Sequence, residues 1–245
     1  MSRSLAVLGA GPALGRAVAR RYAEEGYEVA LVARRREPLE QLAGELTSAG
    51  ATAYAVPGDL SDTAGVGSLA QQIRDKIGDP DALYYGPSSG GFVSAADLTP
   101  QQIQTHMPCA VYSFAALVRE FLPYMIEQRY GAILLAAGAS AVQGMRNFSG
   151  PGPALAAQRN YLQSLQAEVA EHGVYVGRLY IGATIAGSAW HSRVMAEETA
   201  GRPARTRGPV VDAAHLAGLL WAMHQAGTQA ESIYPQGIFS STNAS

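Results

Sequence analysis

The chain has 245 residues, which is enough for one α/β domain with a sizeable hydrophobic core. Hydrophobic residues make up 48% of it and charged residues 16%, a composition typical of a compact globule that excludes a disordered or coiled-coil chain. The formal net charge of −2 argues against a nucleic-acid partner and against attraction to a membrane surface.

Cysteine content and the length of the apolar runs indicate where the protein works. The single cysteine, Cys109, excludes an internal disulfide and is typical of the reducing cytoplasm. No run reaches 18 apolar residues, and the N-terminus leads straight into a strand-like segment, so we expect neither a membrane span nor a signal peptide. No group of residues has metal-ligand spacing, and we expect no bound metal.

Short apolar runs alternate with amphipathic stretches along the chain. The apolar runs predict strands at Leu5–Leu8, Glu28–Val32, Ala51–Val56, Ala82–Tyr85, Gly131–Ala136 and Val174–Tyr180. The amphipathic stretches predict helices at Gly15–Glu25, Pro38–Ala49, Thr63–Ile77, Pro100–Gln128 and Ala154–His172. This alternation predicts a single doubly wound Rossmann-like α/β domain over residues 1–245, with a parallel sheet and helices on both faces.

Two regions interrupt the alternation. Gly86–Ala96 is a loop rich in Gly, Ser and Pro after the fourth strand, and Gly182–Gly208 is a long, loop-rich insertion. Because a structureless connection of that second length is usually a lid or a binding loop, we expect a lid over about 183–208.

A glycine-rich turn joins the first strand to the first helix, with the sequence Gly9-Ala10-Gly11-Pro12-Ala13-Leu14-Gly15. Glycines at such a turn allow the backbone to approach a pyrophosphate, which lies at the N-terminus of the helix. The turn therefore predicts a dinucleotide site, although a strand-to-helix turn can use glycines for its own conformation alone. The residues expected to contact the cofactor are Gly9, Gly11, Pro12, Ala13, Leu14 and Gly15.

The end of the second strand indicates which dinucleotide is bound. An acidic residue there would bind a ribose 2′-hydroxyl, but the chain has Arg34, Arg35 and Arg36. Arginines suit a 2′-phosphate, so we expect NADP(H) in preference to NAD(H), unless these arginines are only solvated charges at the helix start. Asp59, after the third strand, either accepts a hydrogen bond from the adenine amino group or caps the helix that follows.

With these segments in this order, the chain resembles the short-chain dehydrogenase/reductase family over nearly its whole length. Asp59-Leu60, and Phe121–Met125 ahead of Gly131-Ala132-Ile133, also fall in family order. Two departures are visible: Ala13 occupies a usual glycine position, and Tyr85-Gly86-Pro87-Ser88 stands where the family has Asn-Asn-Ala-Gly. The resemblance implies further cofactor contacts at Leu60 and Ser88.

The resemblance also implies where proton transfer takes place. Gly138 stands at the position of the family's catalytic serine, Pro151 at that of its tyrosine, Leu155 at that of its lysine and Ala110 at that of its structural asparagine. No shift of register restores the motif, because the segment 142–160 contains neither tyrosine nor lysine. None of the four side chains can transfer a proton, so we expect an atypical member that lacks the family's catalytic residues.

Two other residues are candidates to donate or accept the proton. His106 lies four residues before Ala110 on the same predicted helix and nearer the carboxyl edge of the sheet, where the ligand is expected. Ser140 lies two residues beyond the empty serine position. The alternatives are a structural histidine and a serine that bonds the backbone of its own loop.

Five residues are candidates to bind substrate: Tyr85, Arg146, Asn147, Trp190 and His191. The first borders the expected nicotinamide region, the next two lie in the loop before the empty tyrosine position, and the last two lie in the expected lid. The alternatives are a tyrosine that caps its strand, solvated loop residues and lid packing.

These observations predict an NADP(H)-binding oxidoreductase, a reductase of a C=O, C=N or C=C bond in a small specialised metabolite, without the Tyr-Lys pair. One alternative is a non-redox enzyme of the same fold, such as a cyclase, dehydratase or isomerase. Another is a catalytically inactive nucleotide-binding subunit. The resemblance further implies a homodimer or homotetramer formed through the long helices Pro100–Gln128 and Ala154–His172.

Overall fold

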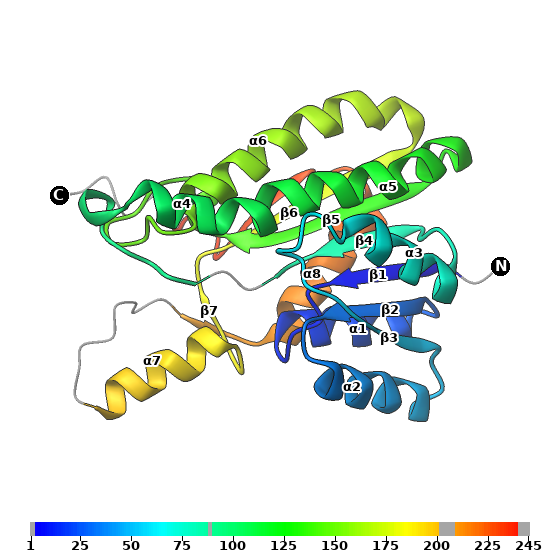
Figure 1. Ribbon diagram of the computed structural model, residues 1–245, viewed down its shortest axis with the longest axis horizontal. Helices are drawn as coiled ribbons and strands as arrows, with labels where there is room; N and C mark the ends of the chain where they lie inside the picture. The colour runs from blue at the N-terminus through cyan, green and yellow to red at the C-terminus, as the bar shows by residue number, and fades with distance from the viewer. Residues whose placement is uncertain (1–2, 88–89, 201–208, 240–245) are drawn as a thin grey trace.

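The computed structural model describes residues 3–87, 90–200 and 209–239 (Figure 1). Its centre is a seven-stranded parallel sheet in the order β3-β2-β1-β4-β5-β6-β9. The strands are β1 Ser4–Leu8, β2 Glu28–Ala33, β3 Ala53–Pro57, β4 Ala82–Tyr85, β5 Gly131–Gly138, β6 Val174–Ile181 and β9 Glu231–Tyr234. The direction of winding reverses between β1 and β4, and ligands of such sheets bind where it reverses.

Helices cover both faces of the sheet (Figure 1). They are α1 Leu14–Glu24, α2 Arg36–Ser48, α3 Val66–Ile77, α4 Pro100–Met107, α5 Ser113–Gln128, α6 Gly152–Val169, α7 Ala189–Thr199 and α8 Ala213–Ala226. One hydrophobic cluster joins α3, α5 and α6 to one face of the sheet, and a second joins α1, α2 and α8 to the other. The predicted doubly wound α/β fold is therefore confirmed.

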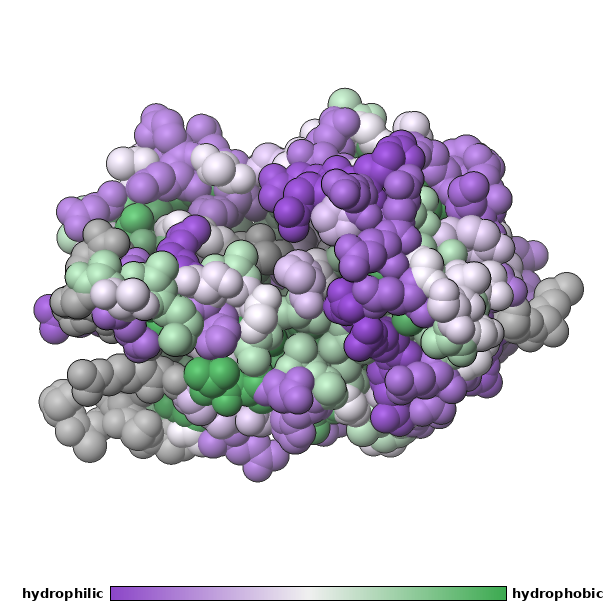
Figure 2. All heavy atoms as spheres, turned by 90° about the horizontal axis from the view of Figure 1, so that it is seen from below, coloured by the Kyte–Doolittle hydropathy of each residue, from purple (hydrophilic) through white to green (hydrophobic). Residues whose placement is uncertain are grey.

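The first strand shows why the sequence favours this arrangement. All five residues of Ser4–Leu8 are buried, as expected for a central parallel strand covered on both faces. Because side chains alternate along a strand, Leu5 and Val7 pack in the cluster of α1, α2 and α8, whereas Ala6 and Leu8 pack in the other. Viewed from below, apolar residues gather in the lower part of the surface, beside a band of hydrophilic residues (Figure 2).

The expected lid region contains more regular structure than the sequence suggests. Part of the loop-rich insertion is the helix Ala189–Thr199, which stands away from the sheet (Figure 1). Before it, β7 Thr184–Ile185 pairs in parallel with β8 Val210–Val211. The expectation of an extended structureless insertion is thus wrong for these residues, and the segment 201–208 lies outside the described ones.

The long helix predicted over Pro100–Gln128 is divided by a π-helical turn, Pro108–Tyr112. Proline has no N–H to continue the α-helical hydrogen bonds, which explains the wider turn at this point. By length and composition this helical run qualifies as a candidate membrane span. That is a weak indication, because core helices pass the same test and the run packs Phe114, Leu117 and Phe121 in the core.

An aromatic cluster joins α8 to α1 and to the start of β2. The Tyr22 hydroxyl lies 2.8 Å from Nδ1 of His224, and the Tyr22 ring packs edge-on against Tyr27 and Trp221. Burial lowers the pKa of His224 from 6.5 to about 4. The folded protein therefore holds this imidazole in its neutral form at neutral pH.

This arrangement predicts a loss of stability in acid. Because the folded-state pKa of His224 is lower than the unfolded one, the unfolded chain takes up the proton first as the pH falls through 6.5 towards about 4. We expect His224 to remove roughly 3 kcal/mol from the free energy of unfolding between pH 7 and pH 4. Urea unfolding of the wild type and of His224→Gln at both pH values checks this: the variant should lose less stability, and an equal loss would contradict it.

Candidate active site

The glycine turn brings backbone segments into direct contact at the carboxyl edge of the sheet. Gly9 has a φ of +108°, and a Cβ on it would lie 2.8 Å from the carbonyl carbon of Gly86. A Cβ on Gly15 would overlap the carbonyl oxygen of Gly9. For Gly11, in contrast, the nearest atom lies 4.0 Å from the Cβ position. Gly9 and Gly15 are therefore required by the fold, whereas Gly11 leaves open space above the turn.

The N-terminus of α1 is free to bind an anion. No side chain caps the helix at Ala13, and its first turn contains no acidic residue. The N–H groups of Gly9 and Ala10 both donate to the carbonyl of Val32, at 3.0 and 2.9 Å, which fixes the turn to the end of β2. Free N–H groups and the positive end of the helix dipole favour a phosphate at this position.

Arg34 and Arg35 follow β2 and lie beside this turn. Both are exposed, and within the described residues neither forms an ion pair or a hydrogen bond through its side chain. The next arginine, Arg36, differs because it pairs with Glu40 at 3.2 Å. Two unpaired guanidinium groups at the end of β2 suit the 2′-phosphate of NADP(H).

Asp59 is exposed beyond β3 and does not cap the following helix. Its Oδ1 accepts a hydrogen bond from the N–H of Ser61 at 2.9 Å. Oδ1 of Asp62 accepts hydrogen bonds from the N–H groups of Ala64 and Gly65, in the turn before α3. No side chain caps α3 at Gly65, so the alternative role weighed for Asp59, that of a helix cap, is not observed. The neighbouring Leu60 is buried and packs in the cluster of α3 and α5.

The end of β5 and the start of α6 bring together several residues predicted for the proton-transfer site. A Cβ on Gly138 would lie 3.8 Å from Cδ1 of Leu155 and 3.6 Å from Oγ of Ser140. Pro151 stands at the N-cap of α6 and Ala110 lies within the π-helical turn. The site between β5 and α6 is thus lined by apolar groups and one hydroxyl.

Ser140 and His106 differ in how they are placed. Ser140 is 8% exposed, and its hydroxyl has no hydrogen-bond partner among the residues that the structure describes. The His106 Nε2 lies 3.8 Å from the Cβ position of Gly91, which places the imidazole against the loop after β4. Burial lowers the pKa of His106 below its usual 6.5, so it is mostly neutral at pH 7. The π-helical turn begins two residues after His106, at Pro108, so the four-residue spacing to Ala110 no longer defines one α-helical face.

Tyr85 points into the core. It is buried, its ring packs 4.5 Å from that of Phe114, and its hydroxyl donates to the carbonyl of Cys109 in the π-helical turn. These contacts favour the alternative to substrate binding, in which Tyr85 holds the end of β4 against the helix. Ser88, the other residue expected in this region, lies outside the described residues.

The remaining substrate candidates come from two loops. Arg146 and Asn147 are exposed, and Asn147 has a φ of +65°, a left-handed conformation that asparagine tolerates. Nδ1 of His191 accepts a hydrogen bond from the N–H of Gly187 at 3.2 Å, so its ring closes the turn before α7. Trp190 packs 5.1 Å from the ring of Phe92.

Phe92 and Phe148 lie next to the candidate residues Trp190 and Asn147, and the sequence analysis does not single them out. Their rings lie 4.9 Å apart, which joins the loop after β4 to the loop before α6. The available signal is the presence of large aromatic residues in segments otherwise rich in glycine and serine. Nothing in their spacing shows that the two rings meet.

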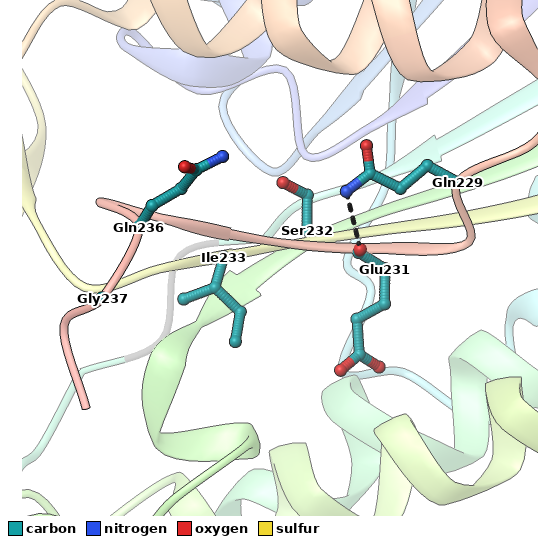
Figure 3. Close-up of a pocket in the computed structure, with 6 residues that line it drawn as sticks. All are labelled: Gln229, Glu231, Ser232, Ile233, Gln236 and Gly237. Atoms are coloured by element: carbon teal, nitrogen blue, oxygen red, sulfur yellow. Dashed lines mark hydrogen bonds between the residues drawn. The ribbon is translucent and has the colours of Figure 1, made fainter. Parts of the chain in front are cut away.

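A separate hollow of about 260 Å³ lies along edge strand β9, which is separated from β1 by β4, β5 and β6. Its walls are mainly polar, as Figure 3 shows for Gln229, Ser232 and Gln236. The Glu231 side chain extends from the other side of β9, and its carboxylate pairs with Arg159 at 2.6 and 3.1 Å (Figure 3). The described residues contain no group of three His, Cys, Asp or Glu side chains that could hold a metal ion.

Comparison with known proteins places this geometry in context. Residues 3–196 match the family model described as short chain dehydrogenase. The fatty acyl-CoA reductase of Acinetobacter baylyi is 28% identical over 177 residues, which cover 71% of this chain and 60% of that protein. The chain thus spans about three fifths of the length of that relative.

Two solved structures share the fold. The L-sorbose reductase of Gluconobacter frateurii, complexed with NADPH and L-sorbose, superposes with a TM-score of 0.84 at 20% identity, over 95% of this chain and 94% of that one. An NADPH-bound short chain oxidoreductase of Pseudomonas aeruginosa, described as containing an atypical catalytic center, gives a TM-score of 0.81 at 22% identity, over 94% of each chain.

Gly15 and Gly11 give a matched pair of variants that tests the close contact between Gly15 and the carbonyl of Gly9. We expect Gly15→Ala to lower the free energy of unfolding by about 1–3 kcal/mol, because its Cβ has to displace backbone. Gly11→Ala should change it by less than about 0.5 kcal/mol, because the space beside it is open. Urea unfolding of both variants measures the difference, and equal effects would show that the contact is not tight.

Proposed function

Because the chain belongs to the short-chain dehydrogenase family, we propose that it is an NADP(H)-dependent reductase of a small specialised metabolite that works without the family's tyrosine and lysine. The observation that carries this proposal is the pair of exposed, unpaired arginines, Arg34 and Arg35, beside an uncapped helix N-terminus. The NADPH complexes of both structural neighbours support the choice of cofactor.

Different residues bind different parts of the cofactor. The free N–H groups at the start of α1 bind the pyrophosphate, while the arginines bind the 2′-phosphate through charge-assisted hydrogen bonds. Asp59 accepts a hydrogen bond from the adenine amino group. When bound, the nicotinamide supplies the hydride that a reduction needs.

Whether the enzyme has to supply a proton depends on the class of substrate. General acid catalysis contributes roughly 10²–10⁴ in rate, and Pro151 and Leu155 provide none of it. A cationic imine accepts hydride without a proton, and a conjugated enone is protonated by water after hydride addition. For a substrate oxygen, the free Ser140 hydroxyl donates a hydrogen bond as negative charge develops. The atypical catalytic center ascribed to the Pseudomonas aeruginosa relative supports a departure of this kind.

A second candidate function is a non-redox reaction, such as cyclisation, dehydration or isomerisation. The apolar lining formed by Gly138, Pro151 and Leu155 favours it, because such a site accelerates a reaction of an already reactive molecule by orienting it, while water takes up or supplies any proton. Turnover that persists after the nucleotide has been removed would select this candidate over the reductase. An inactive nucleotide-binding subunit would bind NADPH and turn over neither class of substrate.

We also propose a cytoplasmic homo-oligomer formed through α5 and α6. The exposed apolar side chain of Tyr112, 54% exposed just before α5, supports an interface there. Light scattering of the purified protein should give twice or four times the mass of one chain.

The cofactor assignment is tested by removing the arginines singly. We expect Arg34→Ala and Arg35→Ala each to weaken NADPH binding about 10- to 100-fold, because each loses a charge-assisted hydrogen bond to the 2′-phosphate. NADH binding should change by less than about threefold. Calorimetric titration with each nucleotide measures both affinities.

Arg36→Ala is the matched control, because Arg36 already pairs with Glu40 and should leave NADPH binding unchanged. If all three variants weakened the binding of NADPH and of NADH by the same factor, the arginines would attract both nucleotides only through their positive charge. The proposed contact with the 2′-phosphate would then be wrong.

His106 and Ser140 are separated by their pH behaviour. Because burial lowers the pKa of His106 below 6.5, its acid form accumulates only below that pH. With a ketone substrate we expect kcat/KM to rise as the pH falls below 6.5 in the wild type and to stay flat in His106→Asn. Ser140→Ala should instead lower kcat about tenfold at every pH, through loss of one hydrogen bond to the developing charge. A wild-type profile that His106→Asn leaves unchanged would exclude a proton from His106.

A further inference from the structure

The first turn of α6 contains a backbone donor without an acceptor. The N–H of Gly152 donates to the carbonyl of Ser149, and Pro153 has no N–H. Ala154 is buried, and its N–H has no acceptor in the described part of the chain. No side chain caps the helix at Pro151. Because a helix N-terminus carries partial positive charge, this free donor favours an anionic partner.

The hydroxyl of Ser140 is a second free donor, and it lies beside the start of α6. Ser140 is more than nine-tenths buried, and its Oγ has no partner among the described residues. The Oγ lies 4.0 Å from the Cβ position of Gly152 and 3.6 Å from that of Gly138. The side chain therefore points into the space between the end of β5 and the start of α6.

Two glycines leave room for a ligand atom next to this hydroxyl. Beyond its own chain neighbours, a Cβ on Gly138 would lie at least 3.6 Å from any atom and one on Gly152 at least 3.8 Å, which are ordinary van der Waals distances. Gly138 is half-buried, so this space is reached from solvent. The unpartnered hydroxyl of Ser113 differs, because it is completely enclosed, whereas that of Ser140 is not among the enclosed atoms.

The charges of the surrounding segment also favour an anion. Residues 131–167 contain two arginines, Arg146 and Arg159, and no carboxylate. The first acidic residue of α6 is Glu168, at the opposite end of the helix. The buried side chain of Leu155 adds apolar surroundings, in which a hydrogen bond to a charged oxygen is stronger than in water.

We propose that Ser140 and the N-terminus of α6 bind the negatively charged oxygen formed during reduction, and that the substrate is a conjugated enone rather than a simple ketone. This inference rests on the proposed function. Addition of hydride to the β-carbon of an enone breaks the C=C π bond, oxidises the nicotinamide and leaves an electron pair on oxygen as an enolate. Water then protonates the α-carbon, so no acidic side chain is required.

The basicity of the product oxygen decides between the two substrate classes. A simple ketone yields an alkoxide, which is about as basic as hydroxide, and the pKa of water is about 15.7. An enolate resembles a phenolate, whose conjugate acid has a pKa of about 10. Ser140 and Ala154 donate hydrogen bonds but supply no acidic proton, so the site suits the weaker base.

Binding of 4-nitrophenol tests the proposal, because its phenolate resembles an enolate, absorbs visible light and forms near neutral pH. It is titrated into full-length protein without nucleotide at pH values on both sides of its ionisation, and binding is followed by absorbance. We expect the phenolate to bind at least about tenfold more tightly than the neutral phenol. Ser140→Ala should reduce that preference to about threefold or less, through loss of one hydrogen bond.

Ser113→Ala is the matched control for the hydroxyl. It makes the same chemical change at a buried, unpartnered serine whose Oγ is enclosed by protein. The preference for the phenolate should be unchanged in this variant.

Pro153 allows the contribution of the helix to be tested separately, because it is exposed at the second position of α6. Pro153→Asp adds a carboxylate that stabilises the helix start but repels a bound anion, so the preference should fall to about threefold or less in a folded protein. Pro153→Asn is nearly the same size without the charge, and it should retain most of the preference.

Several results would overturn the proposal. The wild type would bind phenolate and phenol equally, or neither, or it would show a preference that Ser140→Ala and Pro153→Asp both leave unchanged. Benzoate is titrated as a second anion. Tighter binding of benzoate than of the phenolate would identify a site for a substrate carboxylate and overturn the enone assignment.

The outcome is separable from that of the proposed function, because the titration requires neither nucleotide nor hydride transfer. If NADPH binds and a substrate is reduced but the phenolate is not preferred, the proposal for Ser140 and α6 alone is wrong. If the phenolate is preferred and NADPH does not bind, the anion site stands and the reductase assignment is wrong.

Discussion

The close approach of backbone at Gly9, Gly15 and Gly86 is the contact on which the rest of the structure depends. A side chain on Gly9 would meet the backbone at Gly86, and one on Gly15 would meet the Gly9 carbonyl. These contacts place the N-terminus of α1 over the ends of β1 and β4, where the direction of winding reverses. An anion site at the carboxyl edge follows directly, since the helix begins there without a cap.

The two sides of the candidate site differ in chemistry. The proposed nucleotide side has exposed positive charge at Arg34 and Arg35, whereas the proposed substrate side has the apolar residues Leu155 and Pro151. On this account, charge-assisted bonds hold the cofactor and apolar contact orients the substrate. Rate enhancement then comes from orientation and from the hydride donor more than from acid catalysis.

Much of the fold is predictable from the sequence because local pattern and tertiary structure agree. The first six strands of the sheet are apolar runs bounded by turns, and five helical regions have amphipathic spacing. Helix Ala213–Ala226 and strand Glu231–Tyr234 are not predicted. The helix is apolar nearly all round and shows no period, while the strand lies at a sheet edge and mixes polar with apolar residues.

The sequence predicts those parts of the candidate site that are formed by residues close together in the chain. The glycine turn is one such local motif, and the pair of arginines after β2 is another. The inward orientation of Tyr85 depends on a carbonyl in a π-helical turn, and the contact between Phe92 and Phe148 depends on two loops that are distant in sequence. The absence of a side-chain cap on α3 depends on where the helix begins, and it begins at Val66 rather than at the predicted Thr63.

The most direct test of the account is to follow the cofactor hydrogen itself. Protein incubated with NADPH deuterated at one face of nicotinamide C4, together with a panel of imines, enones and ketones, is analysed by mass spectrometry of the products. The account predicts a product one mass unit heavier from one of the two deuterated faces and an unlabelled product from the other. Products that form without label from both faces, or that form equally well without nucleotide, would contradict it and leave a dehydrogenase fold that catalyses a non-redox reaction.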